Sequence, residues 1–209
     1  MRVAIPAGLR PDQFEGRRRG AAISEFSGPT MGTSWSARIV DAPSDCANAI
    51  DSVLAGIIGQ MSNWEAGSDI SRFNRAPIGQ WVPLLDDLMT VLRAGWEIAR
   101  LSNGAFDPAI GHLVDRWGFG PMANSGVPAG PTGQHGWRQV ELSAGKARRL
   151  SDVTLDLSGI AKGFAVDAVA GALRDMGLAH FLIEIGGELR GEGVKPDMQP
   201  WWVDLEAPP

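Results

Sequence analysis

The sequence contains a single cysteine, Cys46, among its 209 residues. An internal disulfide and a zinc site built from cysteine thiolates are therefore excluded. Cys46 falls at helical spacing with apolar neighbours, so we expect it to behave as a small buried hydrophobe. A role as a nucleophile has little support, because no histidine lies near it in sequence and no catalytic motif surrounds it.

Long apolar runs and clustered basic residues are also missing. No run of about 18 apolar residues occurs, so no transmembrane helix is predicted. The net charge is −5 and the only basic run is Arg17–Arg19, which argues against a nucleic-acid-binding groove. The N-terminal residues hold no continuous apolar segment typical of an export signal, which predicts a cytoplasmic protein if the start is correct. A misassigned start or a decayed twin-arginine leader is the alternative.

The composition is that of a folded globular protein, with 44% hydrophobic and 21% charged residues. We expect residues 1–25 to form a disordered arm and residues 26–209 to form one domain. Strand and helix patterns alternate without a strict βαβ repeat, which favours the α+β class with mixed or antiparallel sheets flanked by helices.

Hydrophobic periodicity predicts the following elements. Helices are expected at 44–61, 83–102 and 160–176, strands at 33–40, 153–157, 181–185 and 200–205, a hairpin from 139–142 and 147–150, a turn at Gly186-Gly187, and loops at 61–77 and 118–136.

The stretch LDLSGIAKGFAVD (Leu155–Asp167) carries the first candidate site. A predicted strand ends there and a helix begins through Ser158-Gly159, so the amide groups of the first helical turn are expected to point outward without partners. Together with the helix dipole and Lys162, they favour a phosphate or a carboxylate. The full Walker spacing is absent, and an ordinary strand-to-helix turn is the competing interpretation.

Four further segments accompany this stretch in the order GPTMGTSW, MSNWEAGSDISRFN, GAFDPAIGHLVDRWGFG and IEIGGELRGEG. Together the five segments resemble the ApbE family of FAD:protein FMN transferases over about residues 28–208. The final stretch, VKPDMQPWWVDLEAPP, is similar to NosX-type members associated with nitrous oxide reductase maturation.

The resemblance implies an enzyme that binds FAD and Mg²⁺. It would transfer the FMN moiety to a Ser or Thr hydroxyl of a partner flavoprotein and release AMP. It also implies a periplasmic location. By position in the motifs, the residues expected to contact the flavin are Met31, Trp64, Ala105, Phe106 and Asp107. Those expected on the phosphate or adenosine side are Ser158, Lys162 and Asp167, and the Ala161 carbonyl would be a metal ligand.

The residues themselves leave alternatives open. Trp64 lies in a polar segment, where its ring could stack on a flavin or cover the core. Asp107 precedes a proline and fits an Asx turn. Asp156 and Asp167 fit ordinary surface acids. The histidines are scattered without a metal-binding spacing, so we expect them to be structural; they are His112, His135 and His180.

Members of the family continue well past the position where this sequence ends. The Asp and Thr metal ligands of the family and a histidine implicated in activating the acceptor hydroxyl have no matching position here, so we expect the catalytic residues to lie beyond Pro209. We therefore expect a truncated member, either a fragment or a chain completed by another chain. The competing functions are a flavin transferase, a flavin-binding or maturation module without transfer activity, and an α+β domain without a flavin site.

Overall fold

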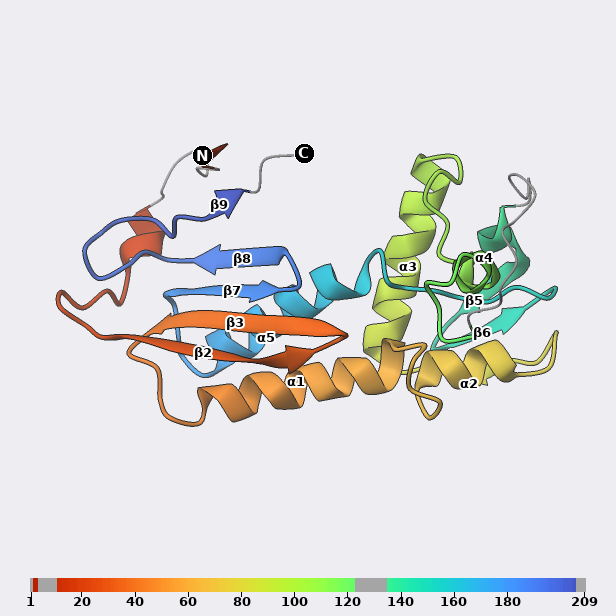
Figure 1. The fold of residues 1–209 in the computed structure, drawn as a ribbon, viewed down its shortest axis with the longest axis horizontal. Coiled ribbons are helices and arrows are strands. Elements are labelled where there is room, and N and C mark those ends of the chain that lie inside the picture. The colour runs from red at the N-terminus through yellow and green to blue at the C-terminus, as the bar shows by residue number, and fades with distance from the viewer. Residues whose placement is uncertain (1, 4–10, 123–134, 206–209) are drawn as a thin grey trace. The chain divides into compact units, whose positions relative to one another are not determined.

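The computed structural model describes residues 2–3, 11–122 and 135–205 (Figure 1). The chain forms two compact units. The first unit is Met1–Leu54 with Ala165–Pro209, and the second unit is Ala55–Phe164. The boundaries fall within two helices, α1 (Cys46–Met61) and α5 (Ala161–Asp175).

The first unit is built on a four-stranded antiparallel sheet. Its strand order is β2 (Ile23–Thr30), β3 (Thr33–Val40), β7 (Phe181–Ile185) and β8 (Glu188–Glu192). In register, Trp35 pairs with Ile185, and Ile39 pairs with Phe181. A second, two-stranded sheet joins β1 (Arg2–Val3) to β9 (Asp204–Leu205), and a short 3-10 helix, η1, spans Pro11–Phe14.

One face of the four-stranded sheet forms the core of the first unit. Alternate residues along β3 and β7 are buried, as expected where one face of a sheet is covered. Residues on α1 and α5 complete this core; the buried set includes Trp35, Ala37, Ile39, Cys46, Ile50, Leu54, Val169, Leu173, Phe181, Ile183 and Ile185.

The turn between β2 and β3 consists of Met31 and Gly32, both with positive φ, +46° and +72°. A two-residue hairpin loop with two positive φ angles has the backbone of a type I′ turn, which matches the twist of the strands on either side. Met31 therefore occupies a left-handed conformation that a residue with a long side chain adopts at some cost.

The second unit combines short helices with a three-stranded sheet. The helices are α2 (Asp69–Arg75), α3 (Asp86–Leu101) and α4 (Gly111–Arg116). The sheet order is β4 (Val82–Pro83), β6 (Lys146–Arg149) and β5 (Val140–Ser143), preceded by the 3-10 helix η2 (Gly136–Gln139). Its core includes Ile57, Met61, Ile70, Phe73, Leu88, Met89, Leu92, Ala99, Ala147, Leu155 and Leu157.

Most of the predicted elements are confirmed, and so is the α+β class. The strand at 33–40 and the strand at 181–185 have the predicted bounds. The hairpin and the three predicted helices are present with ends shifted by a few residues. Helix α3 begins at Asp86 because Pro83 belongs to β4, where it pairs with Lys146.

The loop predicted at 61–77 is wrong, because it contains α2. Ser68 caps this helix: its side chain accepts a hydrogen bond from the Ser71 amide at 3.1 Å. Ile70 and Phe73, three positions apart, are buried at 0% and 1% exposure. Ile70 and Phe73 are two apolar residues with helical spacing in an otherwise polar segment, and one such pair is too weak a pattern to predict a helix.

The strand predicted at 153–157 is also wrong. Leu155 and Leu157 are buried, which accounts for the alternating pattern. The segment pairs with no strand of the described residues. Its backbone groups bond instead to side chains and to other backbone groups; the Gly111 amide, for example, donates to the Thr154 carbonyl at 2.8 Å. The alternating pattern therefore indicated correctly which side chains are buried, but the extended segment that carries them is not part of a sheet.

Other differences are smaller. The strand predicted at 200–205 is confined to β9, and the flanking strands β2 and β8 were not predicted. Strand β2 begins at Ile23, inside the range expected to be an arm. Of the loop predicted at 118–136, residues 123–134 lie outside the described residues. Within the described parts of the chain, no helix is long and apolar enough to cross a membrane.

Candidate functional site

Two asparagines of the second unit hold the extended segment that leads into α5. Asn74 accepts a hydrogen bond from the Leu155 amide at 2.8 Å and donates to the Leu155 carbonyl at 3.0 Å. Asn63 donates to the same carbonyl at 3.0 Å and accepts from the Asn74 side chain at 3.2 Å. The two side-chain amides therefore supply the pairing that a neighbouring strand would otherwise give.

A third contact extends this network toward α5. The Asn63 side chain lies 3.3 Å from one oxygen of Asp156, and the other oxygen of Asp156 accepts from the Ser158 amide at 2.8 Å. The Asp156 amide donates to the Pro108 carbonyl at 2.8 Å. Asp156 is half-buried, and each of its carboxylate oxygens has a hydrogen-bond partner. It is therefore not the solvated surface acid that the sequence also allowed.

Trp64 follows Asn63 on a loop that is closed by serine side chains. Ser68 donates from its hydroxyl to the Ser62 carbonyl at 2.6 Å, and the Trp64 amide donates to the Ser62 hydroxyl at 3.2 Å. The Trp64 side chain is 69% exposed. The alternative in which this ring covers the core is therefore wrong, and the ring is open to a ligand.

The first turn of α5 offers fewer free amides than the sequence predicted. The Ser158 amide is bonded to Asp156, and the amides of Ile160 and Ala161 donate to the Leu157 carbonyl at 3.0 and 2.8 Å. Among the described residues no partner is found for the Gly159 amide. Anion binding at this turn would therefore depend on Gly159 and on the Lys162 side chain rather than on a whole ring of amides.

Phe106 and Asp107 lie beside this turn. A Cβ atom on Gly159 would lie 3.3 Å from the Phe106 ring, so the glycine is in close contact with that ring. One oxygen of Asp107 accepts from the amides of Ala109 at 2.8 Å and Trp137 at 3.0 Å. The first of these bonds is the Asx turn that the sequence predicted, and the second ties it to η2.

The predicted site residues divide between the two units. The second unit holds Trp64, Ala105, Phe106, Asp107, Ser158, Ala161 and Lys162. Within it, Asn63, the neighbour of Trp64, contacts Asp156, and Asp156 in turn bonds to Ser158. Phe106 lies close to Gly159. Met31 and Asp167 belong to the first unit.

Asp167 is already paired in the first unit. Its carboxylate lies 2.5 Å from the Arg190 guanidinium, which also contacts Glu192 at 2.8 Å. The hydrogen bond to Asp167 raises the pKa of Arg190, and Glu192 adds to this effect. Since the Asp167 side chain is 64% exposed, a ligand can still approach it.

The described residues do not by themselves fit a Mg²⁺ site. Mg²⁺ in proteins is usually held by one or two carboxylates together with substrate phosphates and water. The predicted ligand, the Ala161 carbonyl, stands at the start of α5. In the described ranges 2–3, 11–122 and 135–205, no three His, Cys, Asp or Glu side chains gather into a metal-binding group.

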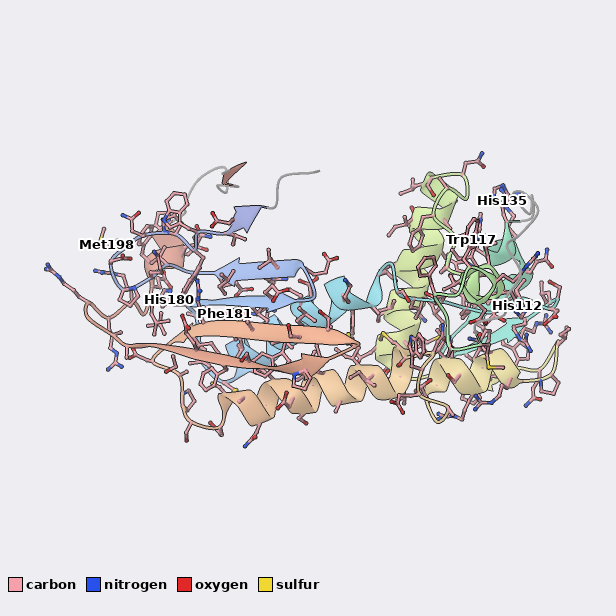
Figure 2. All side chains as sticks on the ribbon, viewed as in Figure 1. His112, Trp117, His135, His180, Phe181 and Met198 are labelled. Carbon is pink, nitrogen blue, oxygen red and sulfur yellow. The ribbon has the colours of Figure 1, made fainter. Side chains whose placement is uncertain are left out.

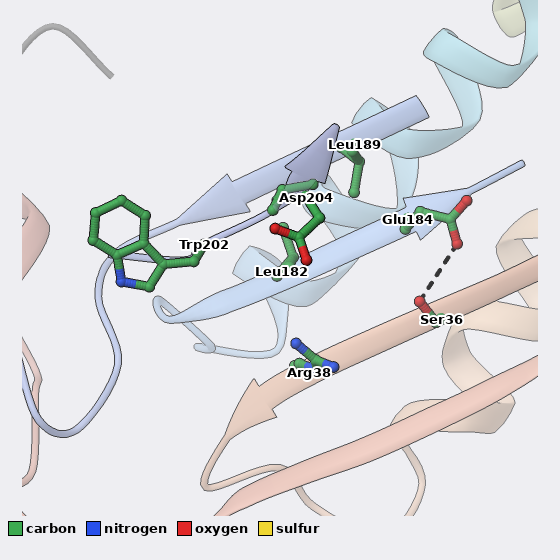
Figure 3. Close-up of a pocket in the computed structure, with 8 residues that line it drawn as sticks. Ser36, Arg38, Leu182, Glu184, Leu189, Trp202 and Asp204 are labelled. Atoms are coloured by element: carbon green, nitrogen blue, oxygen red, sulfur yellow. Dashed lines mark hydrogen bonds between the residues drawn. The ribbon is translucent and has the colours of Figure 1, made fainter. Parts of the chain in front are cut away.

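A cavity of the first unit lies elsewhere, on the sheet face opposite the core (Figure 3). It has a volume of about 760 Å³, and its wall includes the Ser36 hydroxyl 3.4 Å from Glu184. Glu184 lies on the opposite face of β7 from the buried Ile183 and Ile185. No predicted site residue lines this cavity; it is formed by Ser36, Arg38, Leu182, Glu184, Leu189, Trp202, Val203 and Asp204.

The histidines have structural contacts (Figure 2). His180 is 6% exposed and its Nδ1 accepts from the Val194 amide at 3.1 Å. His112 lies 2.9 Å from the Thr154 hydroxyl through Nε2. His135 packs so closely against Gly104 that a side chain there would overlap its ring.

Asn63 and Asn74 were missed as site residues by sequence reasoning. Their role depends on a contact with a segment more than 80 positions away in sequence, with separations of 81 and 92 residues. No local pattern in the sequence reveals contacts over such separations.

Comparison with known proteins identifies the fold. The profile of the ApbE family matches residues 31–209. A curated relative from Vibrio cholerae serotype O1, named FAD:protein FMN transferase, is 32% identical over 92% of this chain. This chain spans 61% of that relative's length.

Solved structures agree. The flavin transferase ApbE from Vibrio cholerae superposes with a TM-score of 0.81 at 32% identity, over 90% of this chain and 65% of that one. The apo form of the flavinyl transferase ApbE from Pseudomonas stutzeri gives a TM-score of 0.79 at 31% identity, over 87% of this chain and 64% of that one. This chain therefore belongs to the ApbE family and has the α+β fold of that family.

Proposed function

We propose that this chain carries the FAD-binding part of an FAD:protein FMN transferase. The observation that carries the proposal is the second-unit network, in which Asn63, the residue before the exposed Trp64, is linked through Asp156 to the Ser158 amide at the start of the turn Ser158–Lys162. FAD has an aromatic ring system joined to a pyrophosphate, so it needs a stacking surface and an anion-binding turn. The curated relative named for this activity supports the assignment.

In this proposal each residue has a definite task. Trp64 offers an aromatic face for an aromatic ring of FAD, with Ala105, Phe106 and Asp107 lining the flavin side. The Lys162 ammonium, with Ser158 and the Gly159 amide, binds the phosphates. For Met31 and Asp167, which belong to the first unit, the proposed contacts to the flavin and to the adenosine side rest on family resemblance alone.

The reaction exchanges one phosphorus–oxygen bond for another. The Ser or Thr hydroxyl oxygen of the partner flavoprotein attacks the phosphorus of the FMN moiety, and the bond to the bridging oxygen breaks so that AMP leaves. The hydroxyl proton passes to a base. Positioning of the pyrophosphate is the contribution that the residues of this chain can make to such a transfer.

Mg²⁺ dependence and a periplasmic location are part of the proposal and rest on family resemblance. The metal supplies charge neutralisation on the phosphates when it is bound. The described residues do not form a metal site by themselves. Fractionation of cells that express the chain from its own gene tests the location.

The second candidate function is a flavin-binding or maturation module that does not transfer FMN. The absence of a metal-binding group among the described residues favours it. One experiment separates the two. Purified protein is incubated with FAD, Mg²⁺ and a panel of Ser- and Thr-containing peptides, and each peptide is examined by mass spectrometry for covalently attached FMN.

Attached FMN, together with released AMP, supports the transferase. FAD binding without attached FMN in any peptide supports the module. A protein that does not bind FAD at all contradicts both functions. The variant Lys162→Ala is expected to weaken FAD binding, whereas Lys146→Ala, which changes an exposed lysine on β6 of the same unit outside the quoted segments, leaves it unchanged.

A further inference from the structure

The orientation of Trp64 is not determined by packing of its own ring. Trp64 is 69% exposed, so its indole lies largely in solvent. The position of Trp64 therefore depends on its backbone, and the preceding residue, Asn63, anchors that backbone through both its carbonyl and its side chain. The Asn63 carbonyl lies 3.5 Å from the Ser71 hydroxyl, and its side chain reaches Leu155 and Asp156.

The same side chain is linked to the turn at the start of α5. Asn63 contacts one oxygen of Asp156 at 3.3 Å, and the other oxygen holds the Ser158 amide at 2.8 Å. Asn74 fixes the position of Asn63 through the 3.2 Å bond between their side chains. A continuous chain of bonds therefore runs from the residue before Trp64 to the first residue of the candidate phosphate-binding turn.

We propose that Asn63 is a positioning residue that sets Trp64 at a fixed place relative to the turn at Ser158–Lys162, with Asn74 and Asp156 as its supports. This inference rests on the proposed function. It concerns a ligand in which an aromatic ring and an anionic group are joined at a fixed distance, as in FAD. Such a ligand binds well only when the protein holds the two surfaces that contact it, the aromatic ring and the anion-binding turn, at the matching distance and orientation.

The alternative is that Asn63 merely stabilises the second unit. A structural role would change FAD affinity and thermal stability in parallel, whatever residue stands at position 64. A positioning role makes the effect of Asn63 depend on Trp64, because there is nothing to position once the ring is removed. A double-mutant cycle measures this dependence directly.

The experiment determines the Kd for FAD from flavin fluorescence for the wild type, Asn63→Ala, Trp64→Ala and the double variant. Melting temperatures are measured on the same samples. We expect Asn63→Ala to weaken binding about fivefold in the wild type and less than about twofold in the Trp64→Ala background. Equal effects in both backgrounds would overturn the proposal.

A matched control is Gln60→Ala. Gln60 is another side-chain amide of the second unit that bonds to backbone groups, the Gly56 carbonyl and the Leu88 amide, but not to the segment before α5. It is expected to change the melting temperature without coupling to Trp64. Coupling of similar size for Gln60 would contradict the proposal.

If Asn63→Ala does not fold, Asp156→Ala breaks the same chain of bonds at its other end and should show the same dependence on Trp64. Additive effects of Asp156→Ala and Trp64→Ala would then overturn the proposal. A wild-type protein that does not bind FAD would instead contradict the proposed function. The two failures are therefore distinguishable.

Discussion

Asn74 bonds to both backbone polar groups of Leu155, although 81 residues separate them. Its amide oxygen accepts from the Leu155 N–H at 2.8 Å, and its amide nitrogen donates to the Leu155 carbonyl at 3.0 Å. A residue near the end of α2 thereby takes the place of a neighbouring strand. The pairing matters because the Leu155 side chain is 1% exposed, so water has poor access to this stretch of backbone.

The first prediction is that Asn74→Ala lowers the free energy of unfolding by about 2 kcal/mol, because it leaves the Leu155 amide without a partner. Urea unfolding at neutral pH measures the change. The control is Asn48→Ala, which removes an exposed asparagine on α1 and should change stability by less than about 0.5 kcal/mol. Equal stability of Asn74→Ala and wild type would show that the pairing contributes nothing.

The second prediction is that Trp64→Ala weakens FAD binding by about three- to tenfold through lost aromatic stacking. Its melting temperature should stay close to that of the wild type, since the ring is largely exposed. Fluorescence titration with FAD measures the affinity. Trp117→Ala provides a comparison, because Trp117 is also exposed, at 53%, and belongs to the same unit. Unchanged affinity in Trp64→Ala would remove Trp64 from the site.

The third prediction separates stability from binding at Met31. Asparagine tolerates positive φ better than methionine and is favoured in type I′ turns, so Met31→Asn should stabilise the protein by about 1 kcal/mol. If Met31 contacts the flavin as proposed, the same variant binds FAD more weakly. Chemical unfolding and FAD titration on one sample test both parts. A gain in stability with unchanged affinity would contradict the flavin contact.

The fourth prediction concerns Cys46, which is completely buried at the start of α1. Desolvation, with a smaller effect from the Asp45 carboxylate, raises the pKa of the Cys46 thiol. The native thiol should therefore react with a disulfide reagent far more slowly than the same thiol in urea. A raised folded pKa also means that stability falls as the pH rises through the range above the ordinary thiol value.

A native reaction rate for Cys46 equal to the rate in urea would contradict its burial. Cys46→Ala, which removes the titrating group, should lose the part of the alkaline destabilisation that comes from the thiol. Comparing the unfolding midpoints of the two proteins at neutral and alkaline pH measures this part.

Periodicity alone predicted the elements whose burial follows a regular repeat. Thr33–Val40 was found to the residue because every second side chain of β3 from Trp35 to Ile39 faces the core. The same reasoning failed at Val153–Leu157, where two buried leucines alternate although no strand in the described part of the chain pairs with them. Alternation reports which side chains are buried, and it carries no information about what satisfies the backbone.

In the candidate site, too, contacts between residues close in sequence could be predicted, whereas contacts made by the tertiary fold could not. Asp107 could be predicted as an Asx turn, because that bond spans two residues and depends only on local sequence. The second bond of Asp107, to the Trp137 amide, spans 30 residues and depends on the tertiary fold. Asn63 and Asn74 make only contacts of this second kind with Leu155, so no local pattern distinguishes them from turn residues.

The pairing of Leu155 has a consequence for the exchange of its amide proton with solvent. Amides outside helices and sheets ordinarily exchange quickly, but the Leu155 proton is held by a side chain and lies over a buried residue. It can exchange only when Asn74 swings away or the second unit opens locally. Its exchange rate in deuterated water therefore measures how often the segment before α5 opens, and the measurement requires no ligand.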